Sequence, residues 1–249
     1  MLGPKSDVTE VVILPGLDGT SRLLEGFCSC LRTLGVPARA VAYPLDQTLS
    51  YVELEQIVRA QLPSKSFVLV GESFSGPLAI RIAADPPAEL LGLVLSTTFA
   101  HSPVPALAPL TSLIRFAPAR PPIALLSWWL LGRWSTSSLR AELGQALRSV
   151  APSVLRARAM TALRADVSAL ALSVQVPTLQ LVAAQDRLLA SSASRALAAV
   201  LPRCRTVTFP GPHLLLQASP NPCAQEVAAF ALGLGPNKSF KPNPLRGSA

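Results

Sequence analysis

The segment that decides the fold is Phe67-Val-Leu-Val-Gly-Glu-Ser-Phe-Ser-Gly-Pro-Leu-Ala-Ile-Arg-Ile-Ala-Ala84. It starts as an apolar, strand-like run, passes through a turn centred on Ser73 and continues as a helical pattern rich in small residues. A buried strand that turns sharply into a helix strains the central residue and exposes its side chain at the helix N-terminus. Free N–H groups and the helix dipole stabilise negative charge there. Ser73 is therefore a candidate nucleophile, and an ordinary helix-capping serine is the alternative.

Strand-like runs continue on both sides of this segment. They are short and almost continuously apolar, as expected for strands that are buried on both faces of a parallel sheet. The runs are 11–14, 39–43, 67–70, 93–96, 178–182 and 206–209. Helical patterns alternate with them at 20–34, 50–62, 74–84, 191–201 and 222–232. We expect an α/β fold with a mostly parallel central sheet of about six strands flanked by helices.

The stretch 101–173 has no strand pattern and is too long for an ordinary crossover. Apolar residues recur in it at helical spacing. One stripe contains Leu139, Leu143 and Leu147 with Ala146 and Val150, and a second contains Leu155, Ala159 and Leu163. We expect an α/β core formed by 1–100 and 174–235, a helical cap insertion over the strand ends at 101–173, and a flexible tail at 236–249 rich in Pro, Asn, Gly and Ser.

The positive charge of the chain is concentrated in one region. The net charge is +8 over 249 residues, and 101–173 holds eight arginines against only Glu142 and Asp166, a balance of +6. No nucleic-acid-binding motif accompanies this excess, so we expect no nucleic-acid partner. The arginines either attract an anionic leaving group, such as a carrier-protein or coenzyme A phosphate, or form a solvated face.

The remaining composition favours a soluble, cytoplasmic protein. The N-terminus lacks the pattern of a secretory signal. The most apolar stretch, 123–134, is shorter than the roughly 20 residues that span a bilayer, so no stable membrane span is expected. The four cysteines, Cys28, Cys30, Cys204 and Cys223, have neither metal-site spacing nor a nearby histidine, and we interpret them as buried free thiols in a reducing compartment. The sequence indicates no oligomeric state.

The turn Gly71-Glu72-Ser73-Phe74-Ser75 resembles the G-x-S-x-G nucleophile elbow of the α/β-hydrolase family, and the resemblance covers most of residues 11–232 outside the insertion. It departs from the motif at Ser75, where the family has glycine. A small side chain is needed there because helix and strand approach closely. Serine meets that need, and Gly76 can supply further room.

The family's order of catalytic residues is serine, acid, histidine. His213 follows the last predicted strand in a loop rich in Pro and Gly, which looks like the family's histidine loop. Asp186 ends the strand-like run before it and matches the family's acid position, with a helix-capping aspartate as the alternative. Asp166 is the competing acid, but it lies in a helical stretch before that strand. His101 precedes every suitable acid, and we interpret it as a structural or substrate-side residue.

The loop after the first strand, Pro15-Gly-Leu-Asp-Gly-Thr20, matches the place where the family forms part of its oxyanion hole. By that resemblance the two backbone donors are the N–H groups of Leu17 and Phe74. The signal for a phosphate-binding interpretation is weak, because no P-loop or dinucleotide motif is present and Asp18 would repel a phosphate. For Asp18 itself we expect helix capping.

The resemblance implies a serine esterase that acts on a small-molecule acyl ester and requires neither metal nor organic cofactor. An acyl thioesterase, an acyltransferase and a non-catalytic binding relative remain alternatives, since the first two use the same residues. In the insertion, Trp128 and Trp129 are candidate substrate-pocket residues for an apolar acyl chain. The alternative is that these rings only pack the cap onto the sheet.

Overall fold

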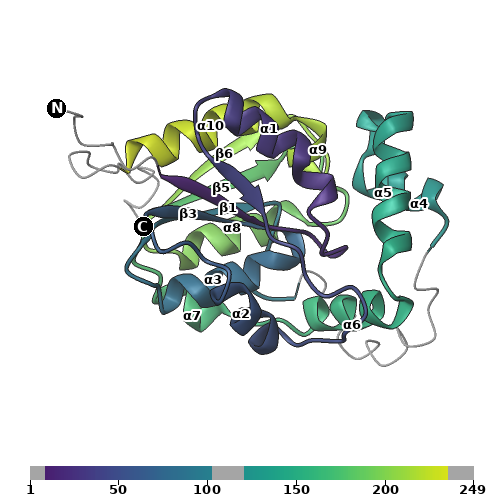
Figure 1. Cartoon of the computed structure of the whole chain (residues 1–249). Coiled ribbons are helices and arrows are strands. Elements are labelled where there is room, and N and C mark those ends of the chain that lie inside the picture. Colours follow the sequence, from purple (N-terminus) through teal and green to yellow (C-terminus); the bar gives the residue numbers. More distant parts are fainter. Residues whose placement is uncertain (1–8, 103–120, 235–249) are drawn as a thin grey trace.

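A computed structural model describes residues 9–102 and 121–234 of the chain. Its centre is a six-stranded sheet in the order β2-β1-β3-β4-β5-β6, in which every neighbouring pair is parallel (Figure 1). The strands are β1 (Glu10–Leu14), β2 (Ala38–Ala40), β3 (Phe67–Glu72), β4 (Leu90–Ser96), β5 (Thr178–Ala183) and β6 (Cys204–Phe209). The predicted parallel α/β sheet and all six of its strands are confirmed.

Strand β2 is shorter than the predicted run 39–43. The Val41 N–H still donates to the Ile13 carbonyl at 2.9 Å, but the Tyr43 N–H donates to the Gly19 carbonyl at 2.8 Å. The chain therefore leaves the sheet after β2 and supports the loop that follows β1.

Helices cover both faces of the sheet. On one face lie α1 (Glu25–Thr33), preceded by η1 (Arg22–Leu24), and α10 (Pro220–Gly233), preceded by α9 (Leu215–Ala218). On the other lie α2 (Tyr51–Arg59), α3 (Gly76–Ala84), α7 (Ser168–Leu172) and α8 (Ser191–Val200). Successive strand residues alternate between the two cores, with Val68 facing the first and Leu69 the second. The strands β1, β3, β4 and β5 are buried on both faces, which explains why they are almost continuously apolar.

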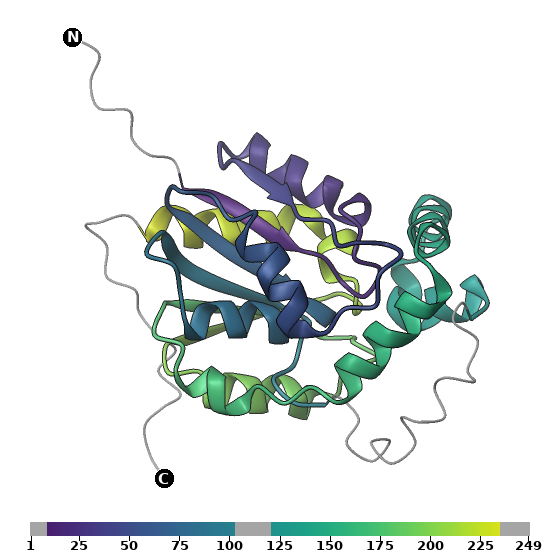
Figure 2. The same ribbon diagram turned by 60° about the horizontal axis from the view of Figure 1, so that its bottom comes forward.

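Most of the helices described between β4 and β5 lie beyond the carboxyl ends of the strands (Figures 1 and 2). The helices in this position are α4 (Ile123–Leu130), η4 (Gly132–Trp134), α5 (Ser137–Ser149) and α6 (Pro152–Leu163). Leu143 and Ala146 of α5 pack with Leu23 of η1 and with Leu214. By contrast, α7 packs against α3 and α8, so the end of the expected insertion lies in the helical layer of the sheet. Residues 103–120 and the expected tail 236–249 lie outside the described residues.

The four cysteines are free thiols, of which Cys28 and Cys223 are buried and Cys30 and Cys204 are partly exposed. Burial raises the pKa of the Cys28 thiol to about 11 and that of Cys223 to about 12. Within 9–102 and 121–234, no helix has both the length and the apolar character needed to cross a membrane.

Candidate active site

Three strands each deliver one of the expected side chains to the same edge of the sheet. Ser73 begins η2 (Ser73–Ser75) directly after β3, Asp186 follows β5, and His213 follows β6 and precedes α9. Ser73 has a φ of 47°, the positive value expected of a residue strained in a strand–helix elbow. Because all strands are parallel, their carboxyl ends meet at one edge, where ligands bind in open α/β sheets.

The three side chains form one hydrogen-bonded chain. Ser73 Oγ lies 2.8 Å from His213 Nε2, and His213 Nδ1 lies 2.8 Å from Asp186 Oδ2. The other carboxylate oxygen, Oδ1, accepts the N–H groups of Leu188 (2.8 Å) and Leu189 (2.9 Å). A carboxylate only accepts, so Nδ1–H donates to Asp186 and Nε2 is left to accept the serine proton. The imidazole is only 2% exposed, so its tautomer is set by these protein contacts.

The competing residues lie elsewhere. Asp166 accepts the Ser168 N–H at 3.0 Å, and its backbone forms an isolated antiparallel bridge with His101.

A further contact joins the loops that carry the acid and the histidine. The Gln185 N–H donates to the Gly211 carbonyl at 3.0 Å, and Gly211 N–H donates to the Gln185 side chain at 2.9 Å.

Two glycines allow the elbow to pack tightly. A Cβ on Gly71 would lie 2.7 Å from the Ala79 Cβ, and one on Gly76 would lie 1.9 Å from Thr98 Oγ1. Gly76 therefore leaves room for Thr98, which follows β4, to approach the elbow closely. The expectation was that Gly76 supplies room at this turn. The Thr98 hydroxyl uses this room to donate to the Ser73 carbonyl at 2.5 Å.

Ser75, which replaces the usual glycine, has a structural function that the sequence did not reveal. Its hydroxyl is fully buried and donates to the Pro15 carbonyl, while Tyr43 Oη lies 2.6 Å away and donates to it. The serine thus ties the nucleophile elbow to the first residue of the loop after β1. A glycine could not form this link.

The two expected oxyanion donors lie on either side of this link. Phe74 occupies the first turn of η2, where N–H groups have no acceptor within the helix. Its ring stacks on Tyr51, with centroids 5.0 Å apart, and its carbonyl accepts the Tyr51 hydroxyl at 2.7 Å. Within the described part of the chain, the Leu17 N–H has no hydrogen-bond acceptor. Both N–H groups are therefore available to a ligand.

Glu72 precedes Ser73 and is almost fully buried. Its Oε1 accepts the Gln217 amide at 2.9 Å, which connects β3 to α9, immediately after the histidine loop. Burial raises the pKa of Glu72 from 4.5 to about 7. The hydrogen bond from Gln217 opposes that shift, the charge of Asp18 adds to it, and the charge of His213 opposes it. One feature of the sequence could have drawn attention to Glu72: it is an acidic residue at the end of an otherwise apolar strand.

Asp18 does not cap a helix, contrary to expectation. Its Oδ2 accepts the Thr20 N–H at 2.9 Å and the Thr20 hydroxyl at 2.5 Å, whereas η1 has no side-chain cap. The aspartate therefore closes a local turn two residues ahead. Burial raises the pKa of its carboxyl, while the bonds from Thr20 and the charge of Arg158 work in the opposite direction.

The tryptophans expected in a substrate pocket lie on α4 and are largely exposed. Trp128 is 56% exposed and Trp129 is 45% exposed. Arg187, next to Asp186, donates to the Trp128 carbonyl at 2.8 Å and its guanidinium lies 4.6 Å from the centroid of the indole. The Leu214 N–H likewise donates to the Leu130 carbonyl at 3.0 Å. Helix α4 thus contacts the acid and histidine loops, and the pocket role of its tryptophans stays a prediction.

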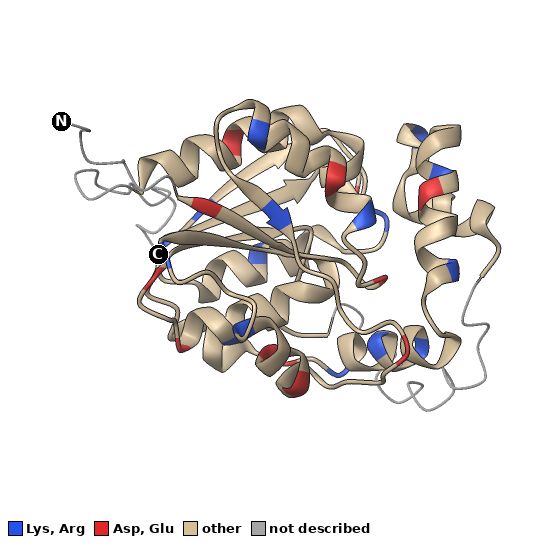
Figure 3. Ribbon diagram, viewed as in Figure 1, with Lys and Arg blue, Asp and Glu red and all other residues tan. Residues whose placement is uncertain are grey.

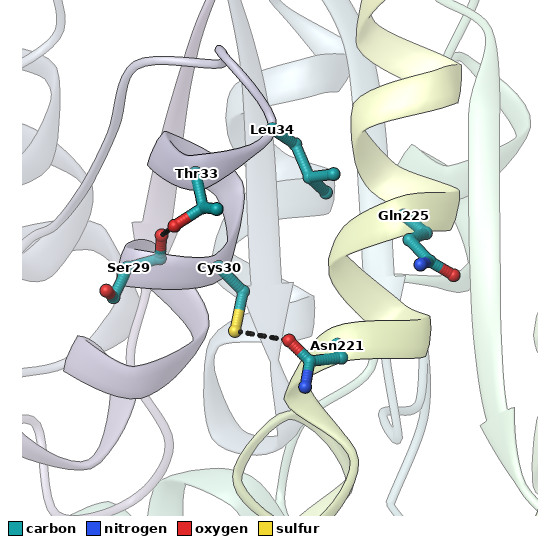
Figure 4. A pocket seen from close by; sticks show the side chains of 6 residues that line it. All are labelled: Ser29, Cys30, Thr33, Leu34, Asn221 and Gln225. Atoms are coloured by element: carbon teal, nitrogen blue, oxygen red, sulfur yellow. Dashed lines mark hydrogen bonds between the residues drawn. The ribbon is translucent and has the colours of Figure 1, made fainter.

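A separate hollow of about 160 Å³ lies between α1 and α10 (Figure 4). The Cys30 thiol in it donates to Asn221 Oδ1 at 3.0 Å. The lining residues are Ser29, Cys30, Thr33, Leu34, Asn221 and Gln225, none of which belongs to the site at the strand ends. In the described ranges, no cluster of three or more His, Cys, Asp or Glu residues could hold a metal ion.

Several solved structures with this architecture are named as hydrolases or esterases, and one is named as a bromoperoxidase. A hydrolase from Pseudomonas aeruginosa PA01 aligns with a TM-score of 0.75 at 19% identity, covering 92% of this chain and 91% of that one. A lipase-esterase related protein from Clostridium acetobutylicum ATCC 824 aligns at 0.74 and 14% identity, covering 92% and 96%. A thermophilic esterase from Thermogutta terrifontis aligns at 0.74 and 18% identity, covering 91% and 90%. No protein-family model and no curated protein matches the sequence. At these identities the likeness establishes the fold, and the activity has to be inferred from the site.

Proposed function

The chain has the α/β-hydrolase fold, and from this premise we propose that it is a serine hydrolase that cleaves a carboxylic ester through an acyl-enzyme on Ser73. The observation that carries the proposal is the unbroken hydrogen-bonded chain from Ser73 through His213 to Asp186, with 2.8 Å at each link. A serine hydroxyl is a weak nucleophile until an adjacent base accepts its proton. The chain supplies that base and the carboxylate that orients it.

In the acylation half-reaction, Ser73 Oγ attacks the ester carbonyl carbon while its proton moves to His213 Nε2. The carbonyl oxygen becomes an oxyanion, which the N–H groups of Leu17 and Phe74 stabilise. Asp186 stabilises the imidazolium that forms. The tetrahedral intermediate then collapses, His213 protonates the departing alkoxide, and the acyl group remains on Ser73.

In the deacylation half-reaction, a water molecule takes the place of the alcohol. His213 accepts a proton from the water as its oxygen attacks the acyl carbon, and a second oxyanion forms on the same two donors. Collapse of this intermediate returns the proton to Ser73 and frees the carboxylic acid. Neither half-reaction needs a group beyond the protein and water.

The direct test compares wild type with Ser73→Ala on 4-nitrophenyl esters of graded acyl length. We expect kcat to fall by about 10⁴-fold or more, because the remaining groups only bind the substrate and its oxyanion. Ser153→Ala, an exposed serine on α6, is the matched control and should keep wild-type turnover. Hydrolysis by Ser73→Ala at the wild-type rate would remove the proposal.

Two further arms distinguish the acyl reactions that share this chemistry. Acyl-CoA thioesters of the same chain lengths test whether a thiol is the preferred leaving group. A competing alcohol, followed by product analysis, tests transfer against hydrolysis. Free acid as the main product from oxygen esters supports the esterase assignment.

A further inference from the structure

The loop after β1 is held by a side chain from helix α6. Arg158 is 2% exposed, and its Nη1 donates to the Leu17 carbonyl at 3.1 Å and to the Asp18 carbonyl at 2.7 Å. Its Nη2 donates to the Pro44 carbonyl at 2.9 Å, and the guanidinium lies 5.5 Å from the centroid of the Tyr43 ring. One planar fork therefore reaches three carbonyls, a geometry that an ammonium group does not provide.

The other arginines of α5 and α6 differ from Arg158. Arg140 and Arg148 of α5 and Arg164 at the end of α6 are exposed, and Arg156 is partly buried. Lys and Arg segments recur along α5 and α6 (Figure 3). Arg158 instead lies on the buried stripe of α6, four residues from Val154. Burial lowers the pKa of its guanidinium, and the electrostatic interactions with Tyr43 and Asp18 oppose that shift. Arg158 therefore contacts the loop after β1 and is shielded from solvent.

The loop is shaped to receive this guanidinium. Gly19 has a φ of 68°, a conformation that favours glycine, and a Cβ on it would lie 2.2 Å from Arg158 Nη1. The Leu17 side chain packs against a small apolar cluster that contains Val154 and Leu155 of α6. Backbone shape, polar contacts and apolar packing therefore all join the loop to the same helix.

These contacts fix three successive peptide groups. Each peptide group is planar, so a bond to a carbonyl also orients the N–H of the next residue. The Gly16 carbonyl accepts the Gly19 N–H at 3.0 Å, which orients the plane that carries the Leu17 N–H. Arg158 holds the carbonyls of Leu17 and Asp18, which orients the next two planes. The Leu17 N–H is a donor that the loop leaves open.

We propose, building on the serine-hydrolase function above, that Arg158 is a positioning residue that holds the Leu17 N–H where the oxyanion forms. It does not touch the reacting atoms. Through it, the docking of α6 on the loop controls how well the transition state is stabilised, while the Ser73–His213–Asp186 chain is left intact. Helix α6 is then part of the catalytic machinery and not only a cover.

The test uses Arg158→Met, which removes the fork but keeps an unbranched side chain, and Arg164→Met as its matched control on the same helix. The substrate is 4-nitrophenyl butyrate, and the transition-state analogue is an alkyl trifluoromethyl ketone. Ser73 Oγ adds to the ketone carbon, the proton moves to His213, and the resulting hemiketal oxygen occupies the oxyanion position.

We expect Arg158→Met to lower kcat/KM by about 10- to 100-fold and to raise the Ki of the ketone by a similar factor, because a misplaced donor weakens transition-state stabilisation. KM should stay close to its wild-type value. The pH dependence of kcat/KM should not shift, because Arg158 does not contact Ser73, His213 or Asp186. Arg164→Met should match wild type in every readout.

A purely structural arginine would give a different result. A folded Arg158→Met protein with a lower melting temperature but wild-type kcat and Ki would overturn the proposal. If Arg158→Met does not fold, Arg158→Lys decides, because it keeps the charge but cannot span three carbonyls. We expect an intermediate loss from it, and wild-type kcat and Ki would again overturn the role. Wild-type protein that neither hydrolyses the ester nor binds the ketone would instead remove the proposed function and this role together.

Discussion

The two halves of the site are held in different ways. Ser73, His213 and Asp186 each follow a strand, and the carboxylate is fixed by two backbone N–H groups of its own loop. The loop at 15–20 is held instead by side chains from distant parts of the chain: Ser75 in the elbow and Arg158 in α6. The loop carries the buried carboxyl of Asp18, and the buried carboxyl of Glu72, the last residue of β3, lies next to it. The ends of the strands thus set the positions of Ser73, His213 and Asp186. Buried polar and charged groups set the position of the loop at 15–20.

Because the two halves are held differently, they should respond differently to substitutions and to pH. A position set by strand ends changes only if the sheet changes, so substitutions there should alter chemistry with little effect on stability. A position set by buried charge depends on protonation and on exact packing, since an unpaired buried charge is costly. We therefore expect pH and small steric changes to act mainly through the loop at 15–20.

The largest effect should come from the half built on the sheet. Asp186→Asn is expected to lower kcat by about 10⁴-fold with little loss of stability, because an amide at this position favours the imidazole tautomer that cannot accept the serine proton. The bonds from Leu188 and Leu189 can be kept by the amide oxygen. The measurement is kcat on a 4-nitrophenyl ester together with thermal unfolding.

Asp166→Asn is the matched control for that prediction. This aspartate accepts the Ser168 N–H, and its substitution should leave kcat at the wild-type level. Equal losses from both variants would show that Asp186 has no special role. A large fall in stability for Asp186→Asn would break the distinction between the two halves.

The next effect concerns Glu72. Burial raises its pKa from 4.5 to about 7, so the folded chain holds this proton more tightly than the unfolded chain does. Stability from this group is complete below about pH 4.5 and is lost as the pH rises through 7, a difference of about 3 kcal/mol by linkage. Glu72→Gln removes the titration, so the variant should gain stability relative to wild type across that window.

Urea unfolding of both proteins between pH 4 and pH 8 measures this difference. The charges of Asp18 and His213 also act on Glu72, but both groups are present in wild type and variant. Glu142→Gln, an exposed site on α5, should run parallel to wild type. A Glu72→Gln profile that also runs parallel would contradict the prediction.

The sequence could predict the half of the site that depends on local patterns. Each strand has an apolar run, and Ser73, Asp186 and His213 each follow one, so parallel strands must bring them to one edge. Their order along the chain matched the family's order. The bounds of β2 were less accurate, because Tyr43 leaves the sheet to bond with Gly19, and no local pattern marks that contact.

The supports of the loop at 15–20 could not be predicted, because they depend on which side of a helix faces the core. Arg156, Arg158 and Arg164 look alike in the sequence, and only the rotation of α6 buries the second of them. A signal was present, since Arg158 lies at helical spacing from Val154 and Leu155, which are both buried. An arginine on the apolar stripe of a helix is therefore a candidate for a buried side chain that holds the backbone of another segment.

The smallest predicted effect sharpens the comparison at a single Cβ. Gly19 and Gly35 both have positive φ, 68° and 79°, but a Cβ on Gly35 would contact nothing within 4 Å, whereas one on Gly19 would displace the Arg158 guanidinium. Gly35→Ala should cost about 1 kcal/mol from backbone strain alone, and Gly19→Ala about 2 kcal/mol because overpacking is added. Only Gly19→Ala should also lower kcat, by roughly tenfold, since it moves the Leu17 N–H, the proposed oxyanion donor. Urea unfolding and ester turnover of the two variants measure both quantities, and equal kcat values would mean that the loop keeps its geometry without Arg158.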